Sequence, residues 1–292
     1  MSATHPKPVT HRFLASWPYL TGDGSRDKFL DVATRYSNTE VLIDSGAFEL
    51  YKTGKSQTVK EYATFLLGLE IEPVDYFQLD VIGDAEATLR NYREMLDMGL
   101  RPIPVWTRGA PVEHFYEMAD TAEYVAIGGV AVGSMTATEG VRPYLRWLHE
   151  EVVRSGDAVH WLGVAKYKLL NYYLPRQCDT TTWLTSSRWL HWRSYYGGGR
   201  WGSELRGAEM GEPLSRGLLV RDYCALRETG YDIDAVINDR ELRNEASVAQ
   251  HLRYATDLAM FGTKMFFATA SPVMFHYLLG AYERGRDVGL YA

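Results

Sequence analysis

Residues 41–48 read Val41-Leu42-Ile43-Asp44-Ser45-Gly46-Ala47-Phe48, an apolar run that ends in an acid, a small residue and a glycine. A buried strand that ends in an acid at the start of a loop is the way an α/β barrel presents catalytic groups. Related segments follow at residues 77–80, which end in Asp80, and at residues 126–130, which contain Gly128 and Gly129. Acids at strand ends, with a Gly-Gly backbone among them, indicate carboxylate chemistry on a flat, hydrogen-bonding substrate.

Short apolar runs bounded by glycine, proline or aspartate recur along the chain and predict buried strands. They cover residues 12–16, 41–44, 76–80, 102–106, 124–128, 159–163 and 265–268. Helical patterns cover residues 58–69, 84–98, 111–119, 138–154, 247–261 and 271–284. This alternation predicts an α/β fold with a parallel sheet, and eight such units would form a (β/α)8 TIM-like barrel.

The chain length and composition fit one such domain. A single α/β barrel commonly has about 250 residues, and the chain has 292. We therefore expect one barrel domain over residues 1–292, with an insertion after the seventh strand at about residues 183–216. Cys178 and Cys224 are the two cysteines of the chain. They form neither a disulfide framework nor a cysteine-rich zinc motif, so no metal and no cofactor are expected.

The sequence also lacks the patterns of a membrane or exported protein. No run of about 18 apolar residues occurs, which predicts no membrane span. The first seven residues are polar and do not resemble a secretory signal, so the expected location is the cytoplasm.

The expected insertion lies in a basic and aromatic stretch of an otherwise acidic chain. The net charge is −6, yet residues 160–206 hold seven lysines and arginines against two acids. Its tryptophans can pack in a subdomain core. Alternatively, the stretch can form a surface that binds phosphates through arginine and stacks bases on indole rings. The arginines and the run Gly197-Gly198-Gly199 favour the second interpretation, with Arg188, Arg193 and Arg200 as nucleic-acid-binding residues.

An ordered set of motifs resembles the tRNA-guanine transglycosylase superfamily. The resemblance is strongest to its phage and bacterial DNA-guanine transglycosylases, which insert 7-deazaguanine bases into DNA. It extends over residues 41–183, roughly half of the chain. The motifs are Asp44-Ser45-Gly46-Ala47-Phe48, Leu79-Asp80, Gly128-Gly129-Val130-Ala131-Val132-Gly133, Trp161-Leu162-Gly163-Val164 and Asp179.

The resemblance implies base exchange through a covalent intermediate. Asp179 would be the nucleophile that attacks C1′ of the target nucleotide and forms a glycosyl ester. Asp44 would be the general acid/base, which protonates the departing guanine and later accepts a proton from the incoming base. The target nucleotide must leave the base stack to reach such a pocket. DNA and a free 7-deazaguanine base are the implied partners, and the sequence leaves a homodimer or a helper protein open.

The resemblance also implies a set of base-binding residues. Asp80 would accept hydrogen bonds from N1 and the 2-amino group, and the backbone of Gly129 would donate to the base carbonyl. Phe48 and Leu162 would enclose the ring from its two faces. The implied substrate-binding residues are Ser45, Phe48, Asp80, Gly128, Gly129 and Leu162.

Each of these residues also has an ordinary structural interpretation. An aspartate after a strand commonly caps a helix or a turn, and this applies to Asp44 and to Asp179, which precedes three threonines. Asp84 is positioned to open the helix that follows Asp80. Gly128-Gly129 can be a tight strand-to-helix turn, and Leu162 can be a core residue.

The chain departs from the family pattern at three points. It lacks the three cysteines of the zinc subdomain of the tRNA enzymes, which favours DNA over tRNA. The family glutamine after the fourth strand is replaced by Val105-Trp106-Thr107-Arg108, and the glutamine after the first-motif aromatic is Glu49. Base recognition can therefore differ from the family pattern.

Three other functions remain open from the sequence. The chain could be a non-catalytic base-binding or nucleic-acid-binding subunit, although it retains both Asp44 and Asp179. It could be a tRNA-directed transglycosylase, or an unrelated barrel glycosidase that uses two carboxylates on a free sugar.

Overall fold

A computed structural model describes residues 6–129, 150, 158–164, 170, 174–184, 191–202, 205–206, 220–271 and 274–292. The chain forms two compact units. The unit that contains the large sheet, called the sheet unit here, comprises His11–Thr180 and Phe266–Val273. The other, called the helical unit, comprises Met1–Thr10, Thr181–Met265 and Met274–Ala292.

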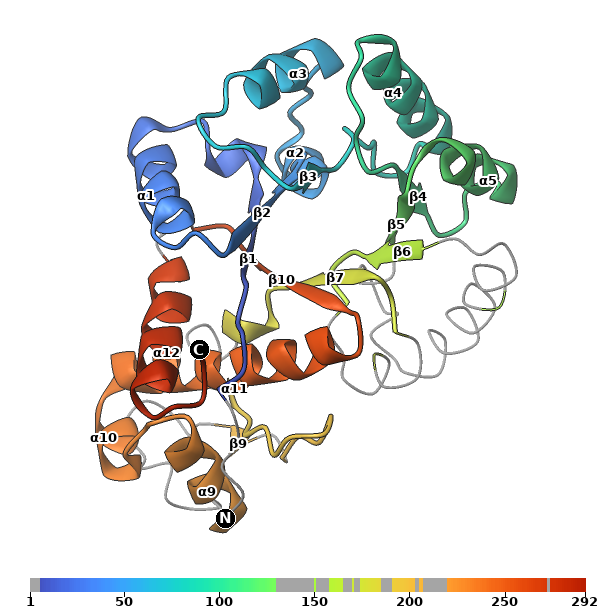
Figure 1. Cartoon of the computed structure of the whole chain (residues 1–292). Coiled ribbons are helices and arrows are strands. Elements are labelled where there is room, and N and C mark those ends of the chain that lie inside the picture. Colours follow the sequence, from blue (N-terminus) through green and yellow to red (C-terminus); the bar gives the residue numbers. More distant parts are fainter. Residues whose placement is uncertain are drawn as a thin grey trace. The chain divides into compact units, whose positions relative to one another are not determined.

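The sheet unit is built on eight strands that curl into a partial barrel (Figure 1). Their order across the sheet is β3-β2-β1-β10-β7-β6-β5-β4, and the pairings seen along it are parallel. The strands are β1 (His11–Ser16), β2 (Thr39–Asp44), β3 (Asp75–Tyr76), β4 (Val105–Thr107), β5 (Tyr124–Gly128), β6 (Ala158–Trp161), β7 (Gln177–Thr180) and β10 (Lys264–Thr269). Strands that neighbour in sequence therefore neighbour in the sheet on each side of β10.

Helices lie between successive strands and cover the outer side of the curved sheet (Figure 1). They are α1 (Asp23–Thr34), α3 (Val59–Leu67), α4 (Ala85–Asp97) and α5 (Val112–Thr121). Local sequence explains where two of them begin. Thr58 and Glu61 form a reciprocal capping box at α3, and Asp84 accepts a hydrogen bond from Ala87 N at α4 (2.8 Å), so each satisfies backbone donors that the first turn leaves unpaired.

An apolar cluster of buried side chains lies within the sheet unit. It contains residues from β1, β2, β4, β5 and β10 together with Phe77 and Ile103. Phe77 and Ile103 form a parallel bridge next to β3 and β4, with Gln78 N donating to Ile103 O (2.9 Å) and Ile103 N donating to Tyr76 O (2.8 Å). The segments that flank the two outermost strands therefore hydrogen-bond to each other.

The helical unit is a group of packed helices with a small two-stranded sheet. Its elements are η3 (Thr182–Leu184), β8 (His191–Trp192), β9 (Leu205–Arg206), α9 (Val220–Glu228), α10 (Ile233–Asn238), α11 (Arg240–Met260) and α12 (Phe275–Asp287). Trp183 is 1% exposed and stacks on Phe275, with ring centroids 6.0 Å apart. Tyr195 is fully buried. One tryptophan of the aromatic stretch, Trp183, therefore packs in the core of the helical unit.

The structure confirms the alternation of strands and helices and corrects several boundaries. The strand expected at residues 76–80 is only Asp75–Tyr76. After it the ladder continues only as the isolated Phe77–Ile103 bridge, and the side-chain amide of Gln78 donates to Thr88 O (3.0 Å). The helix expected at 247–261 begins earlier, at Arg240, where Asp239 caps it. The sequence patterns did not predict α1, α2 (Ala47–Thr53), α9 or α10. The helix expected at 138–154 lies outside the described residues, apart from residue 150.

No helix in the described ranges is both long enough and apolar enough to cross a membrane.

The apolar interior of the sheet unit predicts a large cost for truncating one of its residues. Leu42 is fully buried in the cluster, so Leu42→Ala should lower the free energy of unfolding by about 2–5 kcal/mol through lost burial and a residual cavity. Leu67→Ala is the matched control because Leu67 is 79% exposed, and its effect should stay within about 0.5 kcal/mol. Urea denaturation measures both. Equal effects would show that Leu42 is not a core residue.

Candidate active site

Asp44 is the last residue of β2, and its carboxylate is held by two neighbours. Gly46 N donates to Asp44 Oδ2 (3.0 Å). Ser16 pairs with Asp44 across β1 and β2, and its side chain lowers the pKa of that carboxyl. Gly46 has a φ of +78°, and a Cβ added there would lie 2.3 Å from Pro18 Cδ. Glycine is therefore required at this position, and the turn fixes where Asp44 points.

Asp80 lies beyond β3 and is joined to the first motif. Ser45 Oγ donates to Asp80 Oδ1 (3.1 Å), and Ser45 is fully buried. The capping role at α4 belongs to Asp84, as described above, so it does not account for Asp80. The structure therefore brings Ser45 and Asp80 together, as a shared site requires.

Asp179 is a buried residue within β7 and does not cap a helix. The two hydrogen-bond partners of its carboxylate in the described chain both contact Oδ1. His160 Nε2 lies 3.1 Å from this oxygen, and Gly163 N donates to it at 2.9 Å. Gly163 has a φ of +68°, a left-handed conformation that favours glycine. No described residue hydrogen-bonds Oδ2, so one oxygen is anchored and the other remains available.

Asp44, Asp80 and Asp179 lie close enough for the charge of one carboxylate to shift the pKa of another. Burial raises the pKa of Asp44, and the negative charge of Asp179 raises it further. Burial raises the pKa of Asp80 to about 7, and the charge of Asp44 contributes to this shift. Like charges that share a poorly hydrated site cannot all ionise freely. At neutral pH this site therefore holds protons as well as negative charge.

The glycine pair lies against the end of β4. A Cβ on Gly128 would lie 3.2 Å from Thr107 Oγ1, and a Cβ on Gly129 would lie 3.1 Å from Thr107 Cγ2. Gly129 also has a φ of +75°. Close packing and backbone conformation thus explain both glycines without a ligand. Leu162 is partly buried, packs against the apolar cluster, and would lie 3.9 Å from a Cβ on Gly128.

Phe48 lies on α2, directly after the first motif. Its side chain is 47% exposed, and Lys52 Nζ lies 4.7 Å from the ring centroid. The ring is thus accessible for stacking. The structure gives no contact between it and the carboxylates in the described residues.

The expected nucleic-acid-binding arginines belong to the helical unit. Arg200 is exposed and lies in the Gly197–Gly199 turn, where Arg200 N donates to Gly197 O (3.1 Å). Arg193 is partly buried. Arg188 lies outside the described residues.

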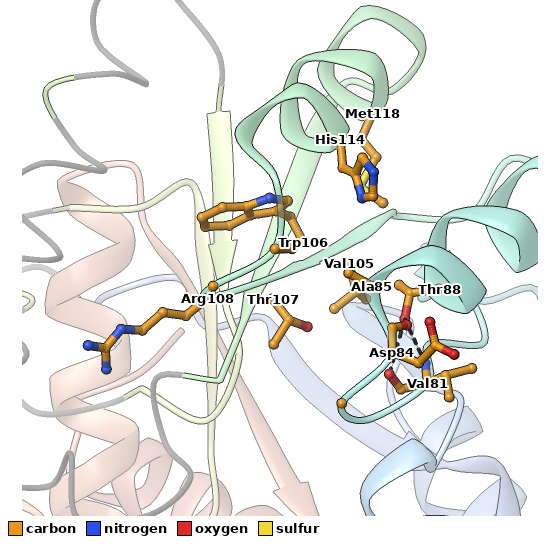
Figure 2. A pocket seen from close by; sticks show the side chains of 13 residues that line it. Val81, Asp84, Ala85, Thr88, Val105, Trp106, Thr107, Arg108, His114 and Met118 are labelled. Atoms are coloured by element: carbon orange, nitrogen blue, oxygen red, sulfur yellow. Dashed lines mark hydrogen bonds between the residues drawn. The ribbon is translucent and has the colours of Figure 1, made fainter.

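A cavity of about 200 Å³ lies between the start of α4 and the loop that follows β4. Its lining includes Thr107 but none of the carboxylates Asp44, Asp80 and Asp179. Figure 2 shows Arg108 extending away from the other lining side chains. The Trp106 side chain is buried and held in place, because its Nε1 donates to Pro111 O (2.9 Å). The cavity is therefore separate from the carboxylate cluster.

His160 is the site residue that the sequence analysis missed. It is fully buried in β6 and contacts Asp179. The available signal was a histidine between Val159 and Trp161 in an apolar strand, where an unpartnered imidazole would be costly. Among the described residues, no group of three or more His, Cys, Asp or Glu side chains is arranged to hold a metal ion.

The raised pKa of Asp80 predicts a pH-dependent stability. The unfolded chain releases this proton near the ordinary value of 3.8, whereas the folded chain keeps it until about 7. The folded state therefore binds more protons between these values, and stability falls as pH rises through this window. Asp80→Asn removes that pH-dependent loss, so its stability relative to wild type should rise by about 3–4 kcal/mol between pH 4 and pH 8.

Urea denaturation at several pH values measures this difference. Asp97→Asn is the control, because it removes one exposed carboxylate at the end of α4. A stability difference between Asp80→Asn and wild type that does not change with pH would contradict the electrostatic description of the site.

Comparison with known proteins gives no match for this chain, either to a protein-family model or to a curated protein. The chemical interpretation of the site therefore depends on its own residues and their geometry.

Proposed function

We propose that the protein is a DNA-guanine transglycosylase, a pentosyltransferase that exchanges guanine in DNA for a 7-deazaguanine base through a covalent glycosyl-aspartate intermediate. One observation carries the proposal. Asp179 has one carboxylate oxygen anchored by His160 and Gly163 and a second oxygen that no described residue hydrogen-bonds. It also lies within electrostatic reach of Asp44, whose pKa is raised by burial and by the charge of Asp179. A nucleophile and a proton donor in one site are what base exchange requires.

Asp179 and Asp44 take different roles because their surroundings differ. Oδ1 of Asp179 accepts from Gly163 N and lies 3.1 Å from His160 Nε2, so this oxygen is held in place. Burial favours the protonated form of Asp44. Asp179 Oδ2 attacks C1′ as the bond to guanine N9 breaks, and Asp44 donates its proton to the departing base. In the return step, Asp44 accepts a proton from the incoming base, which attacks C1′ and releases Asp179.

Base recognition falls to Asp80 and the strand ends around it. Asp80 as a carboxylate accepts from N1 and the 2-amino group, and Ser45 holds it in place. Gly129 presents a backbone N–H to the base carbonyl, and Phe48 and Leu162 contact the ring faces. The Ser45 hydrogen bond and the positive φ of Gly129 support this arrangement, because both fix donor and acceptor positions before the base binds.

We further propose that the curved sheet closes as a (β/α)8 barrel. The Phe77–Ile103 bridge joins the segments beside β3 and β4, and the apolar cluster takes side chains from both edges of the sheet. Closure would bring all strand ends to one rim, where barrel enzymes carry their catalytic residues.

DNA is the proposed polymer, with Arg188, Arg193 and Arg200 as its contacts and a free 7-deazaguanine base as the second substrate. The locally basic stretch at residues 160–206 and the absence of the cysteines of the tRNA enzymes support this choice. A non-catalytic base-binding subunit is the principal alternative. It would bind the base without forming a covalent intermediate.

The first functional prediction concerns the nucleophile. Asp179→Asn should lower base exchange by about 10³-fold or more, because an amide cannot form the glycosyl ester. The fold should persist, since the amide oxygen can still accept from Gly163 N. Incorporation of labelled base into DNA measures the rate, and denaturing gels of protein with guanine-containing DNA and a competing base detect the covalent species.

Asp84→Asn is the matched control because asparagine caps helices as well as aspartate does. It should exchange base and form the covalent species at wild-type levels. Exchange by Asp179→Asn at the wild-type rate would exclude Asp179 as the nucleophile. Base binding by wild type without any exchange would support the non-catalytic alternative.

The second functional prediction concerns the polymer. Each phosphate contact releases counterions, so Arg200→Ala should reduce the steepness of the log–log dependence of DNA affinity on salt by about 0.7 to 0.9. Lys60→Ala removes an exposed cation of the sheet unit and should leave the dependence unchanged. Fluorescence anisotropy with labelled DNA at several salt concentrations measures it. Labelling of tRNA but not DNA by the purified protein would overturn the choice of polymer.

A further inference from the structure

His160 is a polar side chain inside the apolar interior of the sheet unit. It is fully buried. The Phe77 ring packs against it edge-on, with centroids 4.9 Å apart, and the Phe266 centroid lies 6.5 Å away. Both ring nitrogens nevertheless have polar partners: Nδ1 lies 3.2 Å from Gln177 Oε1, and Nε2 lies 3.1 Å from Asp179 Oδ1.

The chemistry of Gln177 sets the direction of the first of these hydrogen bonds. The partner of Nδ1 is Oε1 of Gln177. An amide oxygen can only accept a hydrogen bond, so Nδ1 of His160 carries a proton and donates it to Gln177.

This direction limits the protonation of the pair formed by His160 and Asp179. With a proton on Nδ1, Nε2 can donate to Asp179 only if the ring is an imidazolium; otherwise the carboxyl group must carry the shared proton. Gly163 N donates to the same oxygen of Asp179, which favours negative charge there. Within the described residues, no lysine or arginine forms an ion pair with Asp44, Asp80 or Asp179. A buried carboxylate needs a partner of opposite charge, and His160 is in contact.

We propose that His160 is a positioning residue for the nucleophile: held by Gln177, it pairs as an imidazolium with Asp179 Oδ1 and so directs Oδ2 toward the reacting carbon. The part of this inference that concerns reaction rests on the proposed function. Oδ2 forms the bond to C1′, the C1′–N9 bond breaks, and guanine leaves with the electron pair and the proton of Asp44. The resulting ester is neutral, and its Oδ1 carbonyl still accepts from His160.

A buried histidine with satisfied nitrogens can also be a purely structural residue. The two interpretations differ in what a substitution does. If His160 only fills the core, an apolar residue of similar size should retain activity in proportion to retained folding. If His160 orients Asp179, a variant that keeps a hydrogen-bond donor near the Nε2 position should be more active than a variant without one. This difference should not depend on how stable the two variants are.

Two substitutions separate these effects. His160→Leu keeps apolar volume and removes the donor, whereas His160→Gln retains an N–H that can reach Asp179 Oδ1. His160→Leu should lower kcat for base exchange by about 10- to 100-fold, the range expected for one charge-assisted hydrogen bond. KM for DNA should change less than about twofold. His160→Gln should recover at least half of the loss on a logarithmic scale.

A measurement of the protonation state of His160 does not depend on activity. Nitrogen-15 NMR of histidine-labelled protein at pH 7 should show one buried imidazole with both nitrogens protonated. Asp179→Asn should remove that signature while the protein stays folded. A neutral His160 ring in wild type would overturn the proposal, and so would a His160→Leu enzyme whose kcat matches wild type.

The two proposals can fail separately. If wild type forms no covalent species and exchanges no base, the proposed function fails, while the NMR result still decides whether His160 is charged and paired with Asp179. If wild type exchanges base but His160→Leu and His160→Gln have equal kcat, the positioning role fails and the proposed function stands.

Discussion

The burial of several carboxylates at one edge of a parallel sheet is the constraint on which the site depends. Asp44 ends β2, Asp179 lies in β7, and their charges disfavour each other. Water would screen this repulsion, but burial excludes most of the water. Protein groups take its place: Gly46 N contacts Asp44, and Gly163 N and the His160 ring contact Asp179. These donors require left-handed glycines at 46 and 163, so local backbone conformation and site electrostatics are linked.

The fold class could be predicted because buried parallel strands carry a strong sequence signal. Runs such as Tyr124–Gly128 are apolar throughout, since helices cover one face and the interior the other. Strand β7 is different: Gln177–Thr180 is buried but holds glutamine, aspartate and threonine. Its polar side chains serve the hydrogen-bond network, so hydrophobic patterning does not reveal it. Helix α1 was not predicted for a different reason. Its sequence is polar overall, and no side chain caps its first turn, so neither an apolar pattern nor a start signal marks it.

The sequence motifs indicated which residues belong to the candidate site, but they did not indicate which side chains contact one another. Asp44, Ser45, Asp80 and Asp179 were all expected, and the structure places them in mutual hydrogen-bond or electrostatic contact. His160 was not expected, because a single histidine in a strand has no spacing that identifies it. Its importance follows from register: β6 pairs with β7, and His160 is opposite Gln177. Contacts that depend on pairing between strands are invisible until the sheet order is known.

The contacts of His160 also explain how the Asp179 carboxylate can be buried. A buried polar group is costly unless it is hydrogen-bonded, and an ionised one needs a partner. Asp179 Oδ1 contacts His160 Nε2 and accepts from Gly163 N, and the other ring nitrogen of His160 is held by the amide oxygen of Gln177. In the proposed reaction, Oδ1 therefore keeps its hydrogen-bond partners while Oδ2 forms the ester.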